Sequence, residues 1–345
     1  MHYYPAANTA DKTILAVVSV SGGKDSTATA LLALAAYGRD NCRFVFADTG
    51  NEHDLTLEYV HHYLPSVLGP VDTVRADFRA DILRKREYVE TAWADKGIPD
   101  EIIHRALGVL YPTGVPFLDL CLWKGRFPSR KAQFCTLELK RRPLDQYLLA
   151  RLSPELHVES WRGVRREESA NRKDTPDRER AAEGFEIVFP IAAWTAQHTV
   201  DFVLANGVSL NPLYSQAMSR VGCMPCINCR KDELLEISKR FPEHIDKIRE
   251  WECLVSLASK RGWTTFFCDS ALISTTAIPG WRYSPEVAED GSPVDQWVEP
   301  DSQIYERLRI DSRVRWAQTA RGGRQVDFTR LHAPPACSSV YGLCE

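Results

Sequence analysis

Residues 14–32 read ILAVVSVSGGKDSTATALL, and this stretch decides the fold of the chain. The first seven residues are apolar or small and rich in β-branched side chains, which is typical of a buried parallel strand. Residues 28–36 are rich in Ala and Leu and favour a helix. We therefore predict a strand, a short polar loop and a helix in direct succession.

The loop between them consists of Ser21, Gly22, Gly23, Lys24, Asp25 and Ser26. Glycines let the backbone approach an anion closely, and serine hydroxyls add donors beside the free amides of a helix N-terminus. Lys24 adds a cation at the same place. The pattern fits neither the Walker A motif nor G-x-G-x-x-G. It predicts a phosphate-binding loop, and the alternative is a turn that needs two glycines for its shape.

The composition indicates a globular protein. The chain has 345 residues, 44% hydrophobic content, a net charge of -3 and a pI near 6.3. These values fit one large α/β domain or a domain with an added lobe, and they argue against a wholly basic nucleic-acid binder while allowing a local basic face. Without a signal peptide or an apolar membrane-spanning run, we expect a cytoplasmic protein that does not bind membranes.

A second strand is predicted at residues 43–47 and ends at Asp48 and Thr49. The spacing from the first strand is that of a βαβ unit, so we expect a doubly wound, mostly parallel α/β sheet. Ligands of such sheets bind beyond the carboxyl ends of the strands, which places Asp48 and Thr49 beside the phosphate loop. The alternative is an ordinary turn at a strand end.

Residues 111–131 are rich in Pro, Gly and aromatic residues and predict a loop. Its basic edge consists of Lys124, Arg126, Arg130 and Lys131. This edge is either a solvated surface or a rim that contacts phosphates. Residues 134–144 predict a helix that Pro143 kinks or restarts.

A strand at residues 157–161 runs into a turn at Gly163, followed by Arg165, Glu168 and Arg172. The two guanidinium groups could hold a phosphate or sulfate through paired hydrogen bonds, and Glu168 could orient them. The charge run at residues 173–180 has no apolar partners and predicts a mobile, solvated loop. A helix with Thr195 as its N-cap follows, and residues 206–207 close it.

Cys223, Cys226 and Cys229 form a C-x-x-C-x-x-C motif among the ten cysteines of the chain. Three thiols in one short turn indicate metal binding in a reducing compartment, and the motif needs a fourth ligand. Both zinc and iron–sulfur clusters are bound by such thiolates, so the cysteine pattern alone does not decide between the two. Residues 233–240 and 244–260 predict helices of a C-terminal lobe.

Several of these segments together resemble one family. SGGKDS resembles the pyrophosphate loop of the ATP pyrophosphatase superfamily, and the Asp48-Thr49-Gly50 turn resembles that of phosphoadenylyl-sulfate (PAPS) reductases. Residues 163–172 resemble the signature G-x-R-x-x-E-S-x-x-R, and residues 190–194 resemble P-[LI]-x-x-W. The chain is thereby identified as a member of the PAPS reductase-like family over roughly residues 14–230, with one cysteine, Cys135, where adenylyl-sulfate (APS) reductases have two.

The resemblance implies an adenine nucleotide α-hydrolase (HUP) type domain at residues 12–230 and a helical, irregular lobe at 231–345. It implies that the loop holds the β,γ-phosphates of ATP, with Mg²⁺ held in part by Asp25, because that ion prefers carboxylate and phosphate oxygens. Lys24, Asp25 and Arg165 are the expected catalytic residues. The other expected nucleotide-binding residues are Ser21, Gly22, Gly23, Ser26, Asp48, Thr49, Gly163, Glu168 and Arg172.

By the same resemblance, Cys135, Cys223, Cys226 and Cys229 hold a [4Fe-4S] cluster, with Zn²⁺ as the alternative. The favoured activity is cleavage of ATP to AMP and pyrophosphate, which activates DNA or tRNA for sulfur insertion with a sulfur-donor protein such as a cysteine desulfurase. One alternative is a PAPS or APS reductase that releases sulfite and uses Cys337 or Cys344 of the tail. The other is a nucleotide-binding regulator without catalysis.

Overall fold

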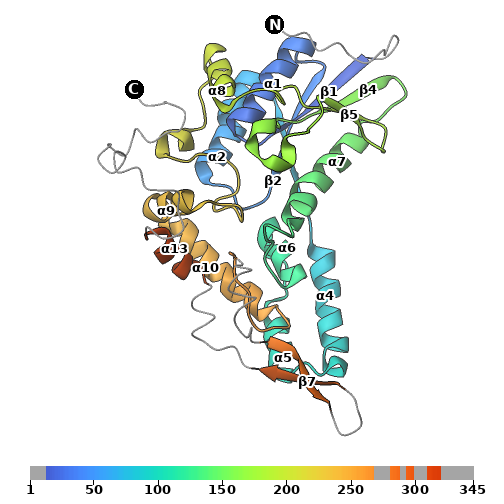
Figure 1. Cartoon of the computed structure of the whole chain (residues 1–345). Helices are drawn as coiled ribbons and strands as arrows, with labels where there is room; N and C mark the ends of the chain where they lie inside the picture. The colour runs from blue at the N-terminus through green and yellow to red at the C-terminus, as the bar shows by residue number, and fades with distance from the viewer. Residues whose placement is uncertain (1–12, 268–279, 288–292, 299–308, 320–345) are drawn as a thin grey trace. The chain divides into compact units, whose positions relative to one another are not determined.

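The structure is a computed structural model, and it describes residues 13–267, 280–287, 293–298 and 309–319 (Figure 1). Its contacts divide the chain into two bodies. The first contains residues 13–76 and 139–224, and the second contains residues 77–138 and the described residues from 225 to 319. The expected single boundary at residue 230 therefore differs from the division in the structure, because residues 77–138 group with the C-terminal part of the chain.

The first body contains a six-stranded sheet in the order β3-β2-β1-β4-β6-β5. The strands are β1 (Thr13–Val20), β2 (Cys42–Asp48), β3 (Val71–Arg75), β4 (Leu156–Trp161), β5 (Arg178–Arg180) and β6 (Glu186–Val188). All neighbours pair in parallel except β5, which pairs antiparallel with β6. Since the chain leaves β1 towards β2 on one side and later adds β4 on the other, the sheet is doubly wound. The predicted fold class is confirmed.

Helices cover both faces of this sheet. They are α1 (Lys24–Tyr37), α2 (Asp54–Glu58), η1 (Tyr59–Tyr63), α3 (Leu64–Leu68), α7 (Arg142–Leu149) and α8 (Ala196–Ala205), with short turns η4 (Arg166–Glu168), η5 (Ala170–Arg172) and η6 (Pro212–Gln216). Successive strand residues point to opposite faces. Val18 and Phe46 belong to a core cluster shared with α1, α3 and α8, whereas Val17 and Val45 belong to one shared with α7.

Two predicted helix boundaries hold. The Thr195 side chain caps α8 by accepting a hydrogen bond from the His198 amide at 3.1 Å. Pro143 lies in the first turn of α7, directly after the π-helical turn η3 (Thr136–Arg141), so the predicted helix restarts there. Proline is tolerated in a first turn because its missing N–H has no helical partner there.

The predicted mobile loop at residues 173–180 is wrong for residues 178–180, which form the edge strand β5. Its Arg178 donates to Glu159 at 2.8 Å and to Glu186 at 2.7 Å. Ion pairs thus hold this strand, and a search for apolar periodicity misses it.

The second body is mainly helical in its described part. It contains α4 (Arg79–Ala92), η2 (Ala94–Lys96), α5 (Asp100–Val109), α6 (Pro116–Lys124), α9 (Lys231–Arg240), α10 (Pro242–Leu257), the antiparallel strands β7 (Gly280–Val287) and β8 (Pro293–Val298), and α13 (Ile310–Ala317). The predicted loop at 111–131 is wrong for α6. Phe117, Leu120 and Leu122 are buried there, so the apolar residues of this segment form core. None of the helices described is both long and apolar enough to cross a membrane.

Candidate functional site

The site lies where the order of the sheet reverses. β1 and β4 are parallel neighbours with Val18 opposite Trp161, so the segments that follow both strands leave the same edge of the sheet. In doubly wound sheets this switch point forms a crevice for ligands. The loop 21–26 follows β1, and Gly163 and Arg165 follow β4. The structure therefore brings together two segments that are far apart in the sequence.

The loop 21–26 folds into a compact, internally bonded turn. Ser26 Oγ accepts from the Ser21 amide at 3.0 Å and donates to the Gly23 carbonyl at 2.9 Å. Gly22 has a φ of 74°, and a Cβ there would lie 3.1 Å from both Thr56 Cγ2 and Val60 Cγ2. A positive φ and this close packing together explain the glycine at position 22. The helix α1 begins at Lys24, so its first amides border the loop.

Lys24 is almost buried, with 4% of its surface exposed. Its Nζ lies 3.5 Å from Asp25 Oδ2, and its backbone amide donates to the hydroxyl oxygen of Tyr214 at 3.0 Å. A buried lysine near the start of a helix places a full positive charge beside the positive end of the helix dipole. This arrangement favours a bound anion.

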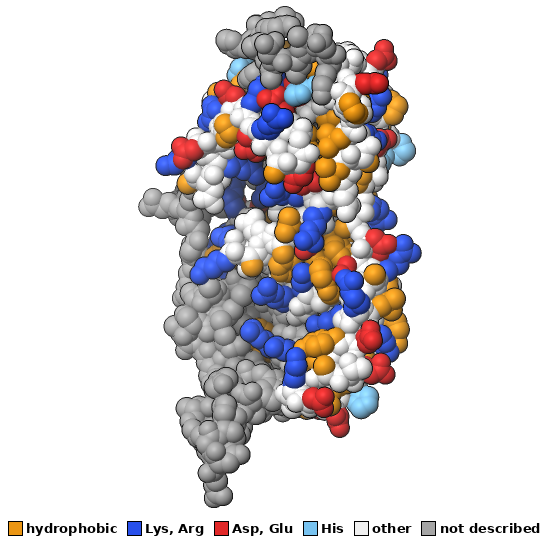
Figure 2. Space-filling view, turned by 90° about the vertical axis from the view of Figure 1, so that its right-hand side faces the viewer, with side chains coloured by type: hydrophobic (Ala, Val, Ile, Leu, Met, Phe, Trp, Pro, Cys, Tyr) orange, Lys and Arg blue, Asp and Glu red, His pale blue; other side chains and the backbone are white. Residues whose placement is uncertain are grey.

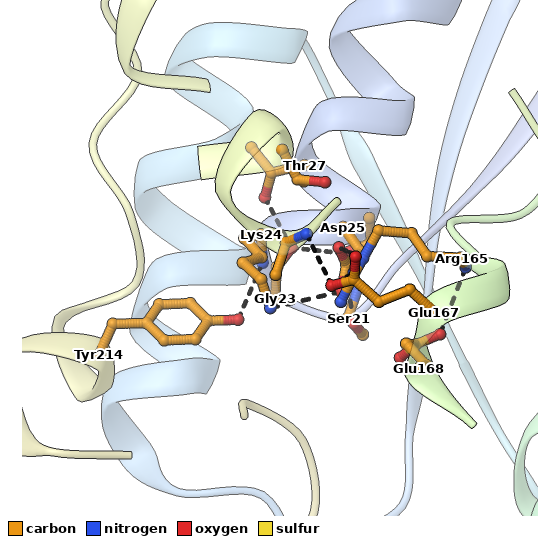
Figure 3. A network of polar contacts seen from close by, with 12 residues as sticks. Ser21, Gly23, Lys24, Asp25, Thr27, Arg165, Glu167, Glu168 and Tyr214 are labelled. Carbon is orange, nitrogen blue, oxygen red and sulfur yellow. Dashed lines mark hydrogen bonds and ion pairs between the residues drawn. The ribbon is translucent and has the colours of Figure 1, made fainter. Parts of the chain in front are cut away.

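Arg165 lies beside Asp25 at the beginning of α1 (Figure 3), and Gly163 packs against the same turn. A Cβ at Gly163 would lie 2.7 Å from the carbonyl oxygen of Asp25, so only glycine allows this approach. Arg165 Nε donates to Asp25 Oδ1 at 2.6 Å, and Arg165 Nη1 donates to Glu167 at 2.9 Å. Burial alone lowers the pKa of Arg165, but the neighbouring carboxylates, Asp25 first, outweigh burial and raise it. The guanidinium therefore remains charged at the loop.

Glu168 and Arg172 follow Arg165 in the same signature and contact each other. Glu168 accepts from the Arg165 amide at 3.3 Å and forms an ion pair with Arg172. The Arg172 side chain is 45% exposed, and its role as a phosphate ligand stays a prediction. Glu168 does connect the two arginines, but it contacts Arg165 through the backbone.

Asp48 and Thr49 lie at the end of β2 as predicted. Asp48 accepts from the Gly50 amide at 2.8 Å and pairs with Arg75 at 3.0 Å. Thr49 is buried and donates from its hydroxyl to Glu52 at 2.7 Å. Cys223 Sγ lies 3.4 Å from the Thr49 hydroxyl, so this cysteine contacts the β2 turn of the first body.

The remaining predicted metal ligands belong to the second body. The Cys229 amide donates to the Cys226 carbonyl at 2.8 Å, and the Asn228 amide lies 3.4 Å from Cys226 Sγ. Arg130 donates to the Cys229 carbonyl at 3.3 Å and so connects the segment before Cys135 to this turn. Burial, and then the nearby Cys135, raise the pKa of Cys121. Cys337 and Cys344 lie outside the described residues.

Sequence reasoning missed three residues of this site, namely Glu52, Glu167 and Tyr214. Glu167 accepts from Arg165 and also from the Ala196 amide at 3.0 Å, in the first turn of α8. Its place inside the residue 163–172 signature was the available signal. No sequence pattern pointed to Tyr214, which reaches the loop from far along the chain.

Comparison with known proteins connects this geometry to a family. A model of the phosphoadenosine phosphosulfate reductase domain matches residues 15–67 and 124–229, which include the loop 21–26, Arg165 and the cysteine motif. The chain belongs to the PAPS reductase-like family. Residues 68–123, which this family model leaves out, include most of the first segment of the second body.

Individual relatives differ in how much of the chain they match. The "uncharacterized 37.8 kDa protein in gpa 5'region" of Escherichia phage 186 is 43% identical over 345 residues, which cover 95% of this chain and 96% of the relative. The adenosine 5'-phosphosulfate reductase of Allochromatium vinosum is 34% identical over 101 residues, or 29% of this chain and 36% of the enzyme. The crystal structure of PAPS reductase from Candida auris matches 61% of this chain and 82% of its own with a TM-score of 0.38 and 13% identity.

Proposed function

We propose that this PAPS reductase-like protein binds ATP at residues 21–26 and cleaves it to AMP and pyrophosphate, which activates a nucleic-acid acceptor for sulfur insertion. The observation that carries the proposal is the loop itself. It combines two glycines, the first amides of α1 and the buried side chain of Lys24 at the N-terminus of one helix. Helix amides and a nearby cation are the groups that bind pyrophosphate-like anions. A substrate without β,γ-phosphates would not need them.

In this proposal an acceptor oxygen attacks the α-phosphorus, and pyrophosphate leaves with the electron pair of the bridging oxygen. The terminal sulfur of a persulfide on the donor protein then displaces AMP from the acceptor. A second thiol of the donor attacks the remaining S–S bond, which leaves the sulfur on the acceptor and a disulfide on the donor. Lys24 and Arg165 neutralise charge that develops on the phosphates, which is the main protein contribution in phosphoryl chemistry. Asp25 holds Arg165 in place and would also hold Mg²⁺, which supplies charge neutralisation on the phosphates when bound.

The test is to incubate ATP with the purified, anaerobically handled protein and to identify the products. We expect AMP and pyrophosphate, and ADP with phosphate would contradict the proposal. Ser21→Ala, Gly23→Val and Asp25→Asn should each weaken ATP binding or turnover. Arg79→Ala, a change at an exposed residue of the second body, should do neither.

For the cysteines we propose a [4Fe-4S] cluster on Cys135, Cys223, Cys226 and Cys229, with Zn²⁺ as the alternative metal. The support is the C-x-x-C-x-x-C spacing together with the Asn228 amide beside Cys226 Sγ, since N–H groups near sulfur stabilise metal-bound thiolates. When bound, the cluster would order the cysteine segment and could exchange electrons.

Iron content and visible absorption of anaerobically purified protein test the cluster. Replacing any of the four cysteines by Ser should remove the absorption. Cys42→Ser is the matched control, because Cys42 is a buried residue of β2 whose pKa burial raises to about 11. Stoichiometric zinc without iron would contradict the cluster and keep the ligand set.

The acceptor we propose is DNA or tRNA. Arg126 and Lys131 are exposed in the second body on the basic segment that precedes Cys135, and Lys and Arg side chains are numerous on the face shown in Figure 2. Binding should weaken steeply with salt because cations that neutralise phosphates release counterions. Charge reversal at Arg126 and Lys131 should abolish stimulation of ATP cleavage by nucleic acid while leaving basal cleavage intact.

The second candidate is reduction of PAPS or APS with release of sulfite, and the similarity to adenosine 5'-phosphosulfate reductases favours it. The products formed from PAPS and from ATP distinguish the two functions. PAPS-dependent sulfite release that Arg165→Ala abolishes, without AMP formation from ATP, would favour the reductase and contradict our first proposal.

A further inference from the structure

Residues 209–224 cross the carboxyl edge of the sheet as one continuous segment, which we call the strap. At its start, the Tyr59 hydroxyl donates to the Ser209 carbonyl at 2.7 Å, and the Ser209 amide donates to the Tyr63 hydroxyl oxygen at 2.6 Å. At its end, the Met224 amide donates to the Asn51 carbonyl at 2.7 Å. Both ends of the strap are therefore fixed to the segment that follows β2.

The middle of the strap lies on the phosphate loop. Tyr214 is buried, its hydroxyl oxygen accepts from the Lys24 amide at 3.0 Å, and the same oxygen lies 3.5 Å from the Cβ position of Gly23 (Figure 3). Lys24 is the first residue of α1. First-turn amides are the groups that bind anions at a helix N-terminus. The Tyr214 oxygen thus occupies a place suited to a phosphate oxygen.

A second observation also indicates a ligand at this place. Asn211 Nδ2 and Thr56 Oγ1 are buried without a hydrogen-bond partner, and the two residues are 2% and 0% exposed. Both residues border Gly22, whose Cβ position is 3.4 Å from Asn211 Nδ2 and 3.1 Å from Thr56 Cγ2. Buried polar atoms without partners are unfavourable, so a rearrangement of the loop that satisfies them is favoured. Gly22 has the backbone freedom to make such a change.

We propose that Tyr214 gates the phosphate site. Its hydroxyl holds the Lys24 amide while the site is empty, and a phosphate oxygen replaces it when a nucleotide binds. The inference rests on the proposed binding of ATP to this loop.

Tyr214→Phe tests the gate, because it keeps the ring and removes the hydroxyl. Inorganic pyrophosphate, measured by calorimetry, should bind the variant about fivefold more tightly than the wild type, since the ligand no longer has to break one hydrogen bond. Tyr63→Phe is the matched control. This change also removes a hydroxyl that accepts a hydrogen bond from a backbone amide of the strap, but the hydroxyl lies away from the phosphate loop. It should leave the affinity for pyrophosphate unchanged.

Hydrogen exchange of residues 212–223 provides the second measurement. Pyrophosphate should speed exchange in the wild type, whereas Tyr214→Phe should exchange fast with or without pyrophosphate.

Equal affinity of wild type and Tyr214→Phe for pyrophosphate would overturn the gate and leave phosphate binding intact. Weaker binding by the variant would also overturn it, because Tyr214 would then be a phosphate ligand. No binding to the wild type would overturn both the gate and the proposed function. Thermal unfolding of each variant verifies that it folds.

Discussion

Arg165 and Asp25 form an ion pair between two segments that meet only in the folded sheet. Their contact is 2.6 Å long, and the side chains are 5% and 18% exposed, so water screens the pair weakly. We expect Arg165→Met and Asp25→Asn to be non-additive in the free energy of unfolding, with a coupling of about 1–3 kcal/mol. Urea unfolding of the two single variants and the double variant measures it.

The exposed pair Arg79 and Asp77 is the control for this cycle, and it should show no measurable coupling because both side chains are solvated. Additive effects at Arg165 and Asp25 would show that their contact does not stabilise the fold.

At Gly163, a methyl group has no room, because the atom it would meet is a backbone carbonyl at 2.7 Å. We expect Gly163→Ala to lower the free energy of unfolding by about 1–3 kcal/mol, as overpacking does, and to weaken nucleotide binding. Gly108→Ala in α5 is the control, since nothing lies within 4 Å of its Cβ position. That change should stabilise or be neutral because Ala favours a helix. A stable Gly163→Ala protein would contradict the close approach.

At the scale of single residues, sequence reasoning located Gly163 and Arg165 but not what they touch. Their signature is local, whereas Asp25 lies far away in the chain and its role depends on sheet order. For Arg172, the spacing suggested a second phosphate ligand, and the structure shows its ion pair with Glu168.

Among the elements, β4 depends on one buried carboxylate. Glu159 is fully buried and accepts from Arg178, from Tyr37 at 2.9 Å and from Trp161 at 2.7 Å. Glu159→Gln removes the fully buried carboxylate of this network and leaves Arg178 paired with Glu186 alone, and we expect a loss of about 3 kcal/mol in stability by chemical unfolding. Glu179→Gln, an exposed change on β5, should have little effect. Equal effects would show that the network is not stabilising.

In the second body, Glu252 of α10 joins two other segments. It accepts from the Phe266 amide at 2.8 Å and from the Ile310 amide at 3.0 Å. Burial raises its pKa from an ordinary value near 4.5 to about 7, and the two amides and Arg309 oppose this rise. A carboxyl with a raised folded-state pKa stabilises fully below the unfolded pKa and loses that contribution as pH rises to 7.

We therefore expect stability to fall between about pH 4.5 and pH 7 by a component of about 3 kcal/mol that Glu252→Gln removes. Urea midpoints across this range measure it. Glu250→Gln, an exposed change on the same helix, should keep the pH dependence of the wild type. An identical slope in both variants would contradict the assignment to Glu252.

Elements with strong periodicity were predictable, and those held by polar contacts were not. β1, β2 and α8 follow from apolar pattern and capping. The strand β5 depends on Arg178, and the apolar run of α6 was obscured by the Pro, Gly and aromatic residues around it.

For the whole molecule, the second body is built from two separate stretches of the chain, residues 77–138 and residues after 224. A fragment that lacks the second stretch should therefore expose the apolar residues of the first. Phe117 of α6 stacks on Trp251 at 5.6 Å and contacts Phe266 at 6.0 Å between ring centres. A fragment that ends at residue 230 loses both partners, so we expect it to aggregate or bind hydrophobic dyes. A fragment that ends at residue 319 keeps them and should not. A monodisperse, cooperatively unfolding 1–230 fragment would contradict the division.

The sequence did not indicate this division, because the Pro-, Gly- and aromatic-rich stretch at residues 111–131 lies inside residues 77–138 and not at either end of them. Their partner residues lie beyond residue 225, and only tertiary packing connects the two parts.

The central place of β1 has a consequence for biosynthesis. β2 and β3 follow it soon in the chain, but β4, its other neighbour, arrives only after residues 77–138. Pairing across such a long separation is slow, and until then the emerging chain presents an open strand edge. The yield of soluble protein should therefore depend more on the speed of translation and on chaperones that cover that edge than on the stability of the finished molecule.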